Sequence, residues 1–148
     1  MTWQTAFSAI NFLVLPAWAL LVLLPKAKIT KTLVHSMLWP VVMGGIYTAS
    51  LIAALFFGMS HPEAGFTMDG VTALFQHPNG VITGWSHYLV FDLFVGAWIG
   101  RDSQRQGIPH WQAVPCILFS FIYGPIGLFL YAMLRLVHGK GFSLIEDK

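Results

Sequence analysis

The sequence has 148 residues, of which 56% are hydrophobic and only 9% are charged, and its formal net charge is +2. A soluble domain carries roughly a quarter charged residues, so a chain of this composition would expose large apolar patches in water. The small net charge, without a block of Lys or Arg, gives no reason to expect a nucleic-acid partner. Composition therefore predicts an integral membrane protein whose first partner is the lipid bilayer.

Four apolar stretches are long enough to cross the hydrocarbon core, for which a helix needs about 20 residues. They are residues 3–24, 33–58, 81–100 and 113–137. Ala17-Trp18-Ala19 has the small-x-small form of a signal cleavage site, but no basic residue precedes it and the apolar run continues to Leu24, so we expect a mature helix. With no repeat or linker, residues 1–148 are predicted to form a single transmembrane domain. The expected fold is all-α, an integral membrane four-helix bundle.

Residues 59–80, between the second and third stretches, contain apolar side chains at helical spacing, from Phe66 to Phe75. We interpret them as a short amphipathic helix lying in the membrane interface. A lid over a lateral opening is the alternative. The sequence His77-Pro78-Asn79-Gly80 is expected to end this segment as a turn.

Lys and Arg are distributed unevenly along the chain. Lys26, Lys28 and Lys31 follow the first stretch, Arg101 and Arg105 follow the third, and Arg135, Lys140 and Lys148 lie near the end. Residues 59–80 have none. Because cytoplasmic loops are enriched in Lys and Arg, the two basic connections favour the cytoplasm and both termini are predicted to lie outside it.

The third stretch carries a carboxylate in its middle. At about 1.5 Å per residue, Asp92 lies roughly 12 Å and 13 Å from the two ends, close to the midplane. An ionised carboxylate there costs at least ~2.5–3.5 kcal/mol, so Asp92 should face protein or water and be protonated or paired. It shares a helix face with Gly96 and Gly100, whose small size lets a second helix approach. His87 lies on a different face, so no direct dyad is expected.

Counting along the hairpin places residues 122–124 opposite Asp92. Pro125 has no N–H, so the carbonyl of Phe121 loses its usual helical partner. Our hypothesis is that protonated Asp92 donates to that carbonyl or shares a hydrogen bond with Tyr123. The alternative is a structural contact between helices, worth about 0.6 kcal/mol on average. Chemistry alone leaves both open.

A second polar cluster is predicted near one membrane face, formed by Arg101, Asp102, His110 and His35. Arg101 and Asp102 are expected to pair at the helix end among the lipid headgroups. No H-x-x-x-H or E-x-x-H spacing places two ligands on one helix face, so neither a cofactor nor a metal is predicted, although a metal site stays an alternative. Cys116 lies in an apolar run and is expected to pack there.

The block GWSHYLVFDLFVGAWIGRDSQRQGIPHWQAVPCILFSFIYGPIGLFLYAMLR resembles the abscisic-acid-deficient-four-like family of small membrane proteins, and FSAINFLVLPAWALLVLLPKAKITKTL resembles its opening. The most specific elements are His87-Tyr88, Phe91-Asp92-Leu93, Arg101-Asp102, Pro109-His110, Pro115-Cys116 and Gly124-Pro125-x-Gly127. Plant members are linked to making neoxanthin from violaxanthin. The resemblance therefore implies a carotenoid or related isoprenoid lipid as substrate, in a bacterial inner membrane or a plastid membrane.

Converting an epoxy carotenoid into an allene needs an acid at the epoxide oxygen and a base at a polyene C–H. There is no redox change, so the resemblance implies a cofactor-free intramolecular isomerase. Asp92, His87 and Tyr123 would handle the protons. The polyene is expected to bind along Trp85, Tyr88, Gly96, Gly124, Pro125 and Tyr47.

Two classes of function stay open at this point, the isomerase and a non-catalytic protein that binds or scaffolds a hydrophobic polyene or isoprenoid. A proton or ion path is disfavoured, because no other apolar stretch carries a carboxylate. The stripe of Gly96 and Gly100 could pack within one chain or across a homo-oligomer.

Overall fold

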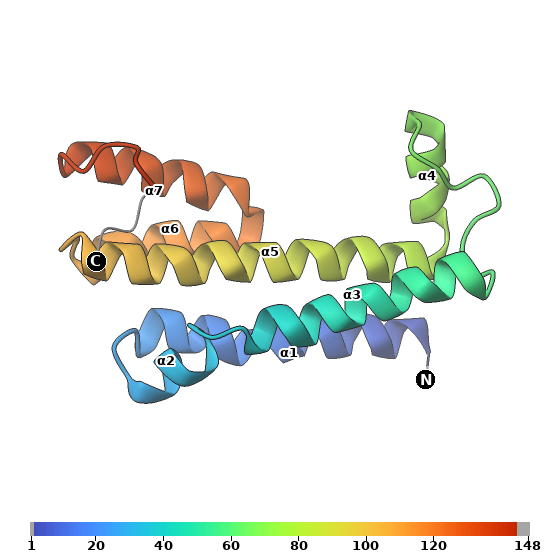
Figure 1. The fold of residues 1–148 in the computed structure, drawn as a ribbon, viewed down its shortest axis with the longest axis horizontal. Coiled ribbons are helices and arrows are strands. Elements are labelled where there is room, and N and C mark those ends of the chain that lie inside the picture. Colours follow the sequence, from blue (N-terminus) through green and yellow to red (C-terminus); the bar gives the residue numbers. More distant parts are fainter. Residues whose placement is uncertain (1, 145–148) are drawn as a thin grey trace. The chain divides into compact units, whose positions relative to one another are not determined.

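The computed structural model describes residues 2–144, and these form seven α-helices and no β-strand (Figure 1). The helices are α1 (Trp3–Leu23), α2 (Lys28–Leu33), α3 (Leu38–Phe56), α4 (Met68–Gln76), α5 (Pro78–Arg105), α6 (His110–Tyr123) and α7 (Pro125–Val137). The all-α class is confirmed. By length and composition, α1 and α3 are able to cross a membrane.

The chain groups into two compact units, described here one at a time. Unit 1 contains the residues up to Pro16 together with Met37–Phe91, and unit 2 contains Ala17–Ser36 together with the residues from Asp92 onward. The long helices α1 and α5 belong to both units, because α1 is divided after Pro16 and α5 after Phe91.

In unit 1, the first half of α5 is bonded to α3 and α1. Asn79 is buried, and its Nδ2 donates to the backbone carbonyl oxygens of Ser50 at 2.9 Å and Met59 at 3.0 Å. Trp85 Nε1 donates to Asn11 Oδ1 at 2.9 Å. These hydrogen bonds between uncharged groups hold the first half of α5 to α1, to α3 and to the residue Met59 that follows α3.

Helix α4 stands across the first turns of α5 (Figure 1). It begins where Thr67 Oγ1 accepts from the backbone N–H of Gly70 at 3.1 Å, an N-terminal cap. The predicted turn over His77–Gly80 is wrong, because only His77 separates α4 from α5 and Pro78 begins the next helix. Proline suits that position, since the first turn of a helix does not use its backbone N–H groups.

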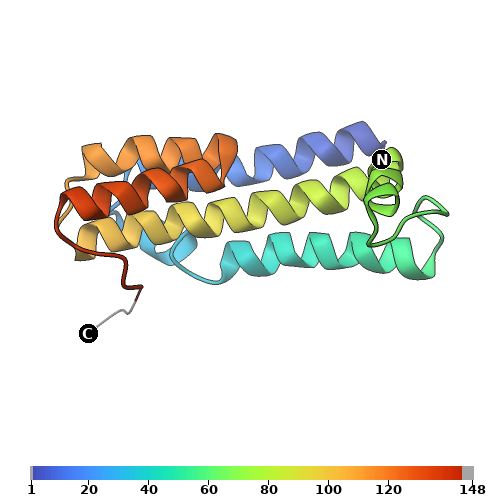
Figure 2. The same ribbon diagram turned by 90° about the horizontal axis from the view of Figure 1, so that it is seen from above.

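Unit 2 contains a reversal where one continuous helix was predicted over residues 113–137. Helix α6 ends at Tyr123, Gly124 adopts φ 51° and ψ −92°, and Pro125 starts α7. The two helices lie side by side and run in opposite directions (Figures 1 and 2). The ring of His138, just after α7, contacts Gln112 Oε1 in the first turn of α6 at 2.6 Å. The prediction of one helix is therefore wrong: Gly124 adopts a positive φ that other residues rarely adopt, and the chain turns back there.

The α6–α7 hairpin is tightly closed at Gly127. A Cβ at this position would overlap the backbone N of Ser120 and the carbonyl oxygen of Cys116. Cys116 is buried in the hairpin, so its expected packing role is confirmed.

The second half of α5 packs against the second half of α1. A Cβ on Gly96 would overlap the indole of Trp18, and a Cβ on Gly100 would lie 3.4 Å from Leu21 Cδ2. The glycine stripe predicted from the sequence is thus a close helix contact. The predicted second stretch begins too early, since residues 34–37 separate α2 from α3 and leave His35 outside both helices.

Candidate functional site

Asp92 lies in α5 against the turn of the α6–α7 hairpin. Asp92 is buried, with 7% of its surface exposed. A Cβ atom built on Gly124 would overlap Oδ1 of Asp92 and lie 2.9 Å from its Cγ. The carboxyl group thus occupies the space that any other side chain at position 124 would need. Gly124 joins the last carbonyls of α6 to the first N–H groups of α7, the groups that helix ends leave without intrahelical partners. A protonated carboxyl can donate a hydrogen bond to a carbonyl of this kind and accept one from an N–H group.

The predicted partners of Asp92 are only partly at this site. Tyr123 is 54% exposed, and its ring stacks on Phe119 with centroids 6.2 Å apart. A hydrogen bond between its hydroxyl and Asp92 stays a prediction. The ring of Phe121 packs on Trp18, with centroids 5.2 Å apart. Donation from Asp92 to the Phe121 carbonyl stays a prediction.

Four of the other predicted residues form two ring contacts in unit 1. His87 is exposed and its ring centroid lies 5.6 Å from that of Tyr47 and 4.8 Å from that of Phe91. Trp85 and Tyr88 stack at 5.1 Å. The four side chains therefore pack as two pairs, and a catalytic or substrate-binding role for them stays a prediction.

The predicted groove along the glycines is not open. Trp18 covers Gly96 and the Asp92 carboxyl covers Gly124, while Pro125 is exposed. Unit 2 instead has an apolar pocket of about 250 Å³ lined by Phe94, Val95, Trp98, Leu128 and Leu144. Sequence reasoning missed this pocket because its walls come from α5, α7 and the segment after α7.

Asp102 is completely buried, and its partners come from α5 and α7. Tyr131 Oη donates to Asp102 Oδ2 at 2.6 Å, Arg135 Nη1 lies 3.4 Å from the same oxygen, and Arg105 pairs with Oδ1. The predicted pair of Arg101 and Asp102 at the headgroups is therefore wrong. Consecutive residues on a helix do not face each other, whereas residues three and four apart do. That rule could have found Arg105 as a partner of Asp102 on the same helix, but it could not have found Tyr131 and Arg135, which come from α7.

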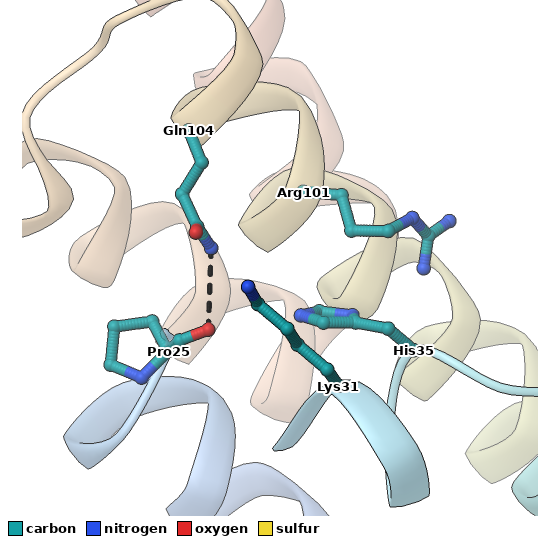
Figure 3. A pocket seen from close by; sticks show the side chains of 5 residues that line it. All are labelled: Pro25, Lys31, His35, Arg101 and Gln104. Atoms are coloured by element: carbon teal, nitrogen blue, oxygen red, sulfur yellow. Dashed lines mark hydrogen bonds between the residues drawn. The ribbon is translucent and has the colours of Figure 1, made fainter. Parts of the chain in front are cut away.

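The other members of the predicted second cluster separate into two places. His35 and Arg101 line one pocket with Pro25, Lys31 and Gln104, as Figure 3 shows. His110 makes a different contact, with a ring nitrogen 2.9 Å from the carbonyl oxygen of Val22. Among residues 2–144, no group of three or more His, Cys, Asp or Glu side chains is placed to hold a metal ion.

Comparison with known proteins is consistent with the elements quoted above. Protein ABA DEFICIENT 4, chloroplastic, from Arabidopsis thaliana is 27% identical over 131 residues, which cover 84% of this chain and 58% of the relative. The chain thus spans little more than half the length of that protein. No solved structure matches. The model of the ABA DEFICIENT 4-like family matches residues 5–131, so the chain belongs to that family.

Proposed function

We propose that the protein is embedded in a membrane and acts on a carotenoid or related isoprenoid lipid by acid–base chemistry, in the manner of a neoxanthin synthase. Family membership supports the carotenoid link. The observation that carries the chemical part is the buried carboxyl of Asp92 against the turn at Gly124. Ionisable groups at membrane depth are costly, and those that persist are functional candidates by default.

The helix lengths support a membrane arrangement that differs from a simple four-helix bundle. Helices α1, α3 and α5 have 21, 19 and 28 residues, enough for a core about 30 Å thick. Helices α6 and α7 have 14 and 13 residues, roughly 20 Å each at 1.5 Å per residue. We therefore place three crossing helices in the bilayer, with the α6–α7 hairpin entering and leaving from one side. Asp92 then meets the tip of this hairpin deep in the membrane.

The isomerisation balances without a cofactor. A protonated Asp92 donates its proton to the epoxide oxygen as the C–O bond breaks. The proton lost from the polyene C–H replaces the proton that the Asp92 carboxyl has given away. The electrons of that C–H bond form the new double bond of the allene. A positioned acid or base of this kind contributes typically 10²–10⁴-fold to a rate.

The apolar pocket of unit 2 is a suitable place for one part of the polyene. Val95, in its wall, lies three residues from Asp92 on α5, so the two residues are neighbours on the helix surface. The rings of Phe94 and Trp98 give the pocket flat apolar walls. A conjugated chain has no hydrogen-bonding groups and would bind there by apolar contact alone.

The test uses the full chain in mild detergent, with violaxanthin supplied and the allenic product measured by chromatography and mass spectrometry. Asp92→Asn is expected to lower turnover by at least ~100-fold, since the amide cannot donate an acidic proton. Bound polyene and the melting temperature should change little. Asp69→Asn, the same chemical change at an exposed residue of α4, is the matched control and should keep the wild-type rate. An Asp92→Asn protein that turns over normally would overturn the acid–base role.

A non-catalytic carotenoid-binding or scaffold protein is the second candidate, because the contact between Asp92 and Gly124 could simply hold the hairpin in place. In that case the purified protein binds the polyene without converting it. Asp92→Asn would then change the melting temperature and nothing in the bound pigment.

A further inference from the structure

A pocket in unit 2 collects positive charge and takes no part in the chemistry proposed for Asp92. It has a volume of about 250 Å³ and is lined by Pro25, Lys31, His35, Arg101 and Gln104 (Figure 3). Lys31 comes from α2, His35 from the connection after it, and Arg101 from the last turns of α5. Three of these side chains can carry a positive charge, and none of the lining residues is a carboxylate.

Among residues 2–144, the imidazole of His35 has no hydrogen-bond partner. Both ring nitrogens are buried. A buried polar group left this way destabilises the folded chain. Burial first, and then the positive charges of Arg101 and Lys31, lower the pKa of His35 below its ordinary value of 6.5. An anion in this pocket would meet a hydrogen-bond donor in the imidazole and would be attracted by the positive charges of Lys31 and Arg101.

Hydrogen bonds hold the walls of this pocket in place. Thr30 is completely buried, its Oγ1 donates to the carbonyl of Leu24 at 2.5 Å, and its own carbonyl accepts the backbone N–H of His35 at 3.1 Å. Gln104 Nε2 donates to the carbonyl of Pro25 at 3.4 Å, the dashed line in Figure 3. Binding would therefore need little ordering of the backbone, which favours affinity.

We propose that this pocket binds a phosphate group, carried either by an anionic lipid or by a free phosphate ion. The guanidinium of Arg101 presents a fork of donors that matches phosphate oxygens, and Lys31 adds a mobile point charge. A tetrahedral phosphate presents oxygens in several directions, which suits donors arriving from α2, α5 and the connection that carries His35. The pocket also lies where the apolar run of α1 ends, the level at which lipid headgroups are found in a membrane.

The test measures binding to the full chain in a neutral detergent by titration calorimetry. The probes are short-chain phosphatidylglycerol, inorganic phosphate, and a diacylglycerol of the same chain length without the phosphate. The pocket variant is Lys31→Gln with Arg101→Gln. The matched control is Lys26→Gln with Lys28→Gln, which removes the same charge from two exposed lysines of the same connection. We expect the pocket variant to bind the phosphate probes roughly tenfold or more weakly, as for loss of charged hydrogen bonds, and the control to bind normally.

Saturable binding of either phosphate probe, lost only in the pocket variant, supports the proposal. Competition by inorganic phosphate identifies a free-phosphate site, and its absence identifies a lipid headgroup. Equal binding of the diacylglycerol, an equal loss in the control variant, or no binding of either phosphate probe overturns the proposal. Lys31→Gln alone, at an exposed residue, is the second variant if the double change does not fold, and it should also weaken binding roughly tenfold.

Discussion

Units 1 and 2 differ most in how they carry charge. Residues 2–16 and 37–91 contain no Lys or Arg. The Lys and Arg residues of the described chain all belong to unit 2: Lys26, Lys28, Lys31, Arg101, Arg105, Arg135 and Lys140. Lys148, counted in the charge argument from sequence, lies outside the described residues.

The buried polar groups follow the same division. In unit 1 they are neutral, and Asn79, Thr83 and Ser86 donate to backbone carbonyls. In unit 2 they include the ionisable groups of Asp92, Asp102 and Arg135. Buried neutral groups need only a hydrogen bond, whereas buried charges need a specific counter-charge or a change of protonation. Unit 1 is therefore suited to an apolar environment, and the buried ionisable groups of the described residues lie in unit 2.

The largest effect should come from breaking the charge cluster of unit 2. Asp102→Ala leaves Arg135 buried without a counter-charge and should lower the free energy of unfolding by about 3–5 kcal/mol. Ser86→Ala, at a buried neutral group of unit 1, should cost only about 0.5–1.5 kcal/mol. Denaturant unfolding in detergent, followed by circular dichroism, measures both. An equal loss of unfolding free energy in the two variants would contradict the proposed difference between buried charges in unit 2 and buried neutral groups in unit 1.

A smaller effect is expected from two helical glycines, one from each unit, that differ in the space around them. Gly127→Ala forces a methyl group into the backbone of α6 and should destabilise the chain by about 1–3 kcal/mol. Gly45 in α3 has no atom within 4 Å of a built Cβ, so Gly45→Ala should stabilise that helix by roughly 0.5–1 kcal/mol. Melting temperatures of the two variants test the pair. A stabilising Gly127→Ala would show that the hairpin is looser than described.

The smallest effect concerns pH. Because the pKa of His35 is lowered in the folded chain, the unfolded chain binds more protons between that lowered value and 6.5. The contribution of His35 to stability is therefore complete above pH 6.5 and decreases as the pH falls through this window. His35→Gln should flatten this part of the stability profile, measured as melting temperature against pH. An unchanged slope would show that His35 is not the group titrating there.

The sequence predicted the elements that depend on local pattern. The apolar run from Trp3 predicted α1 to within one residue of its end at Leu23, because a basic connection follows it. The spacing of Gly96 and Gly100 predicted a close helix contact, which Trp18 and Leu21 provide.

The reversal at Gly124 could not be read in the same way. A Gly-Pro pair is compatible with a kinked helix as well as with a turn, and nothing local separates the two. The close fit of Gly127 against Ser120 favours the turned-back form, and that fit exists only once the helices have met. The partners of Asp102 were missed for a related reason, since Tyr131 lies 29 residues away in sequence.

In the proposed membrane arrangement, the α6–α7 hairpin also determines whether the number of full crossings is odd or even. In that arrangement, three full crossings followed by a half-depth return would bring the segment after Val137 to the face where α6 begins, next to Gln112. Arg135 and Lys140 would then share that face with Arg105, instead of opposing it as the four-crossing arrangement required. All basic residues of the described chain would sit on a single side, and reporters fused to the two ends would read opposite compartments.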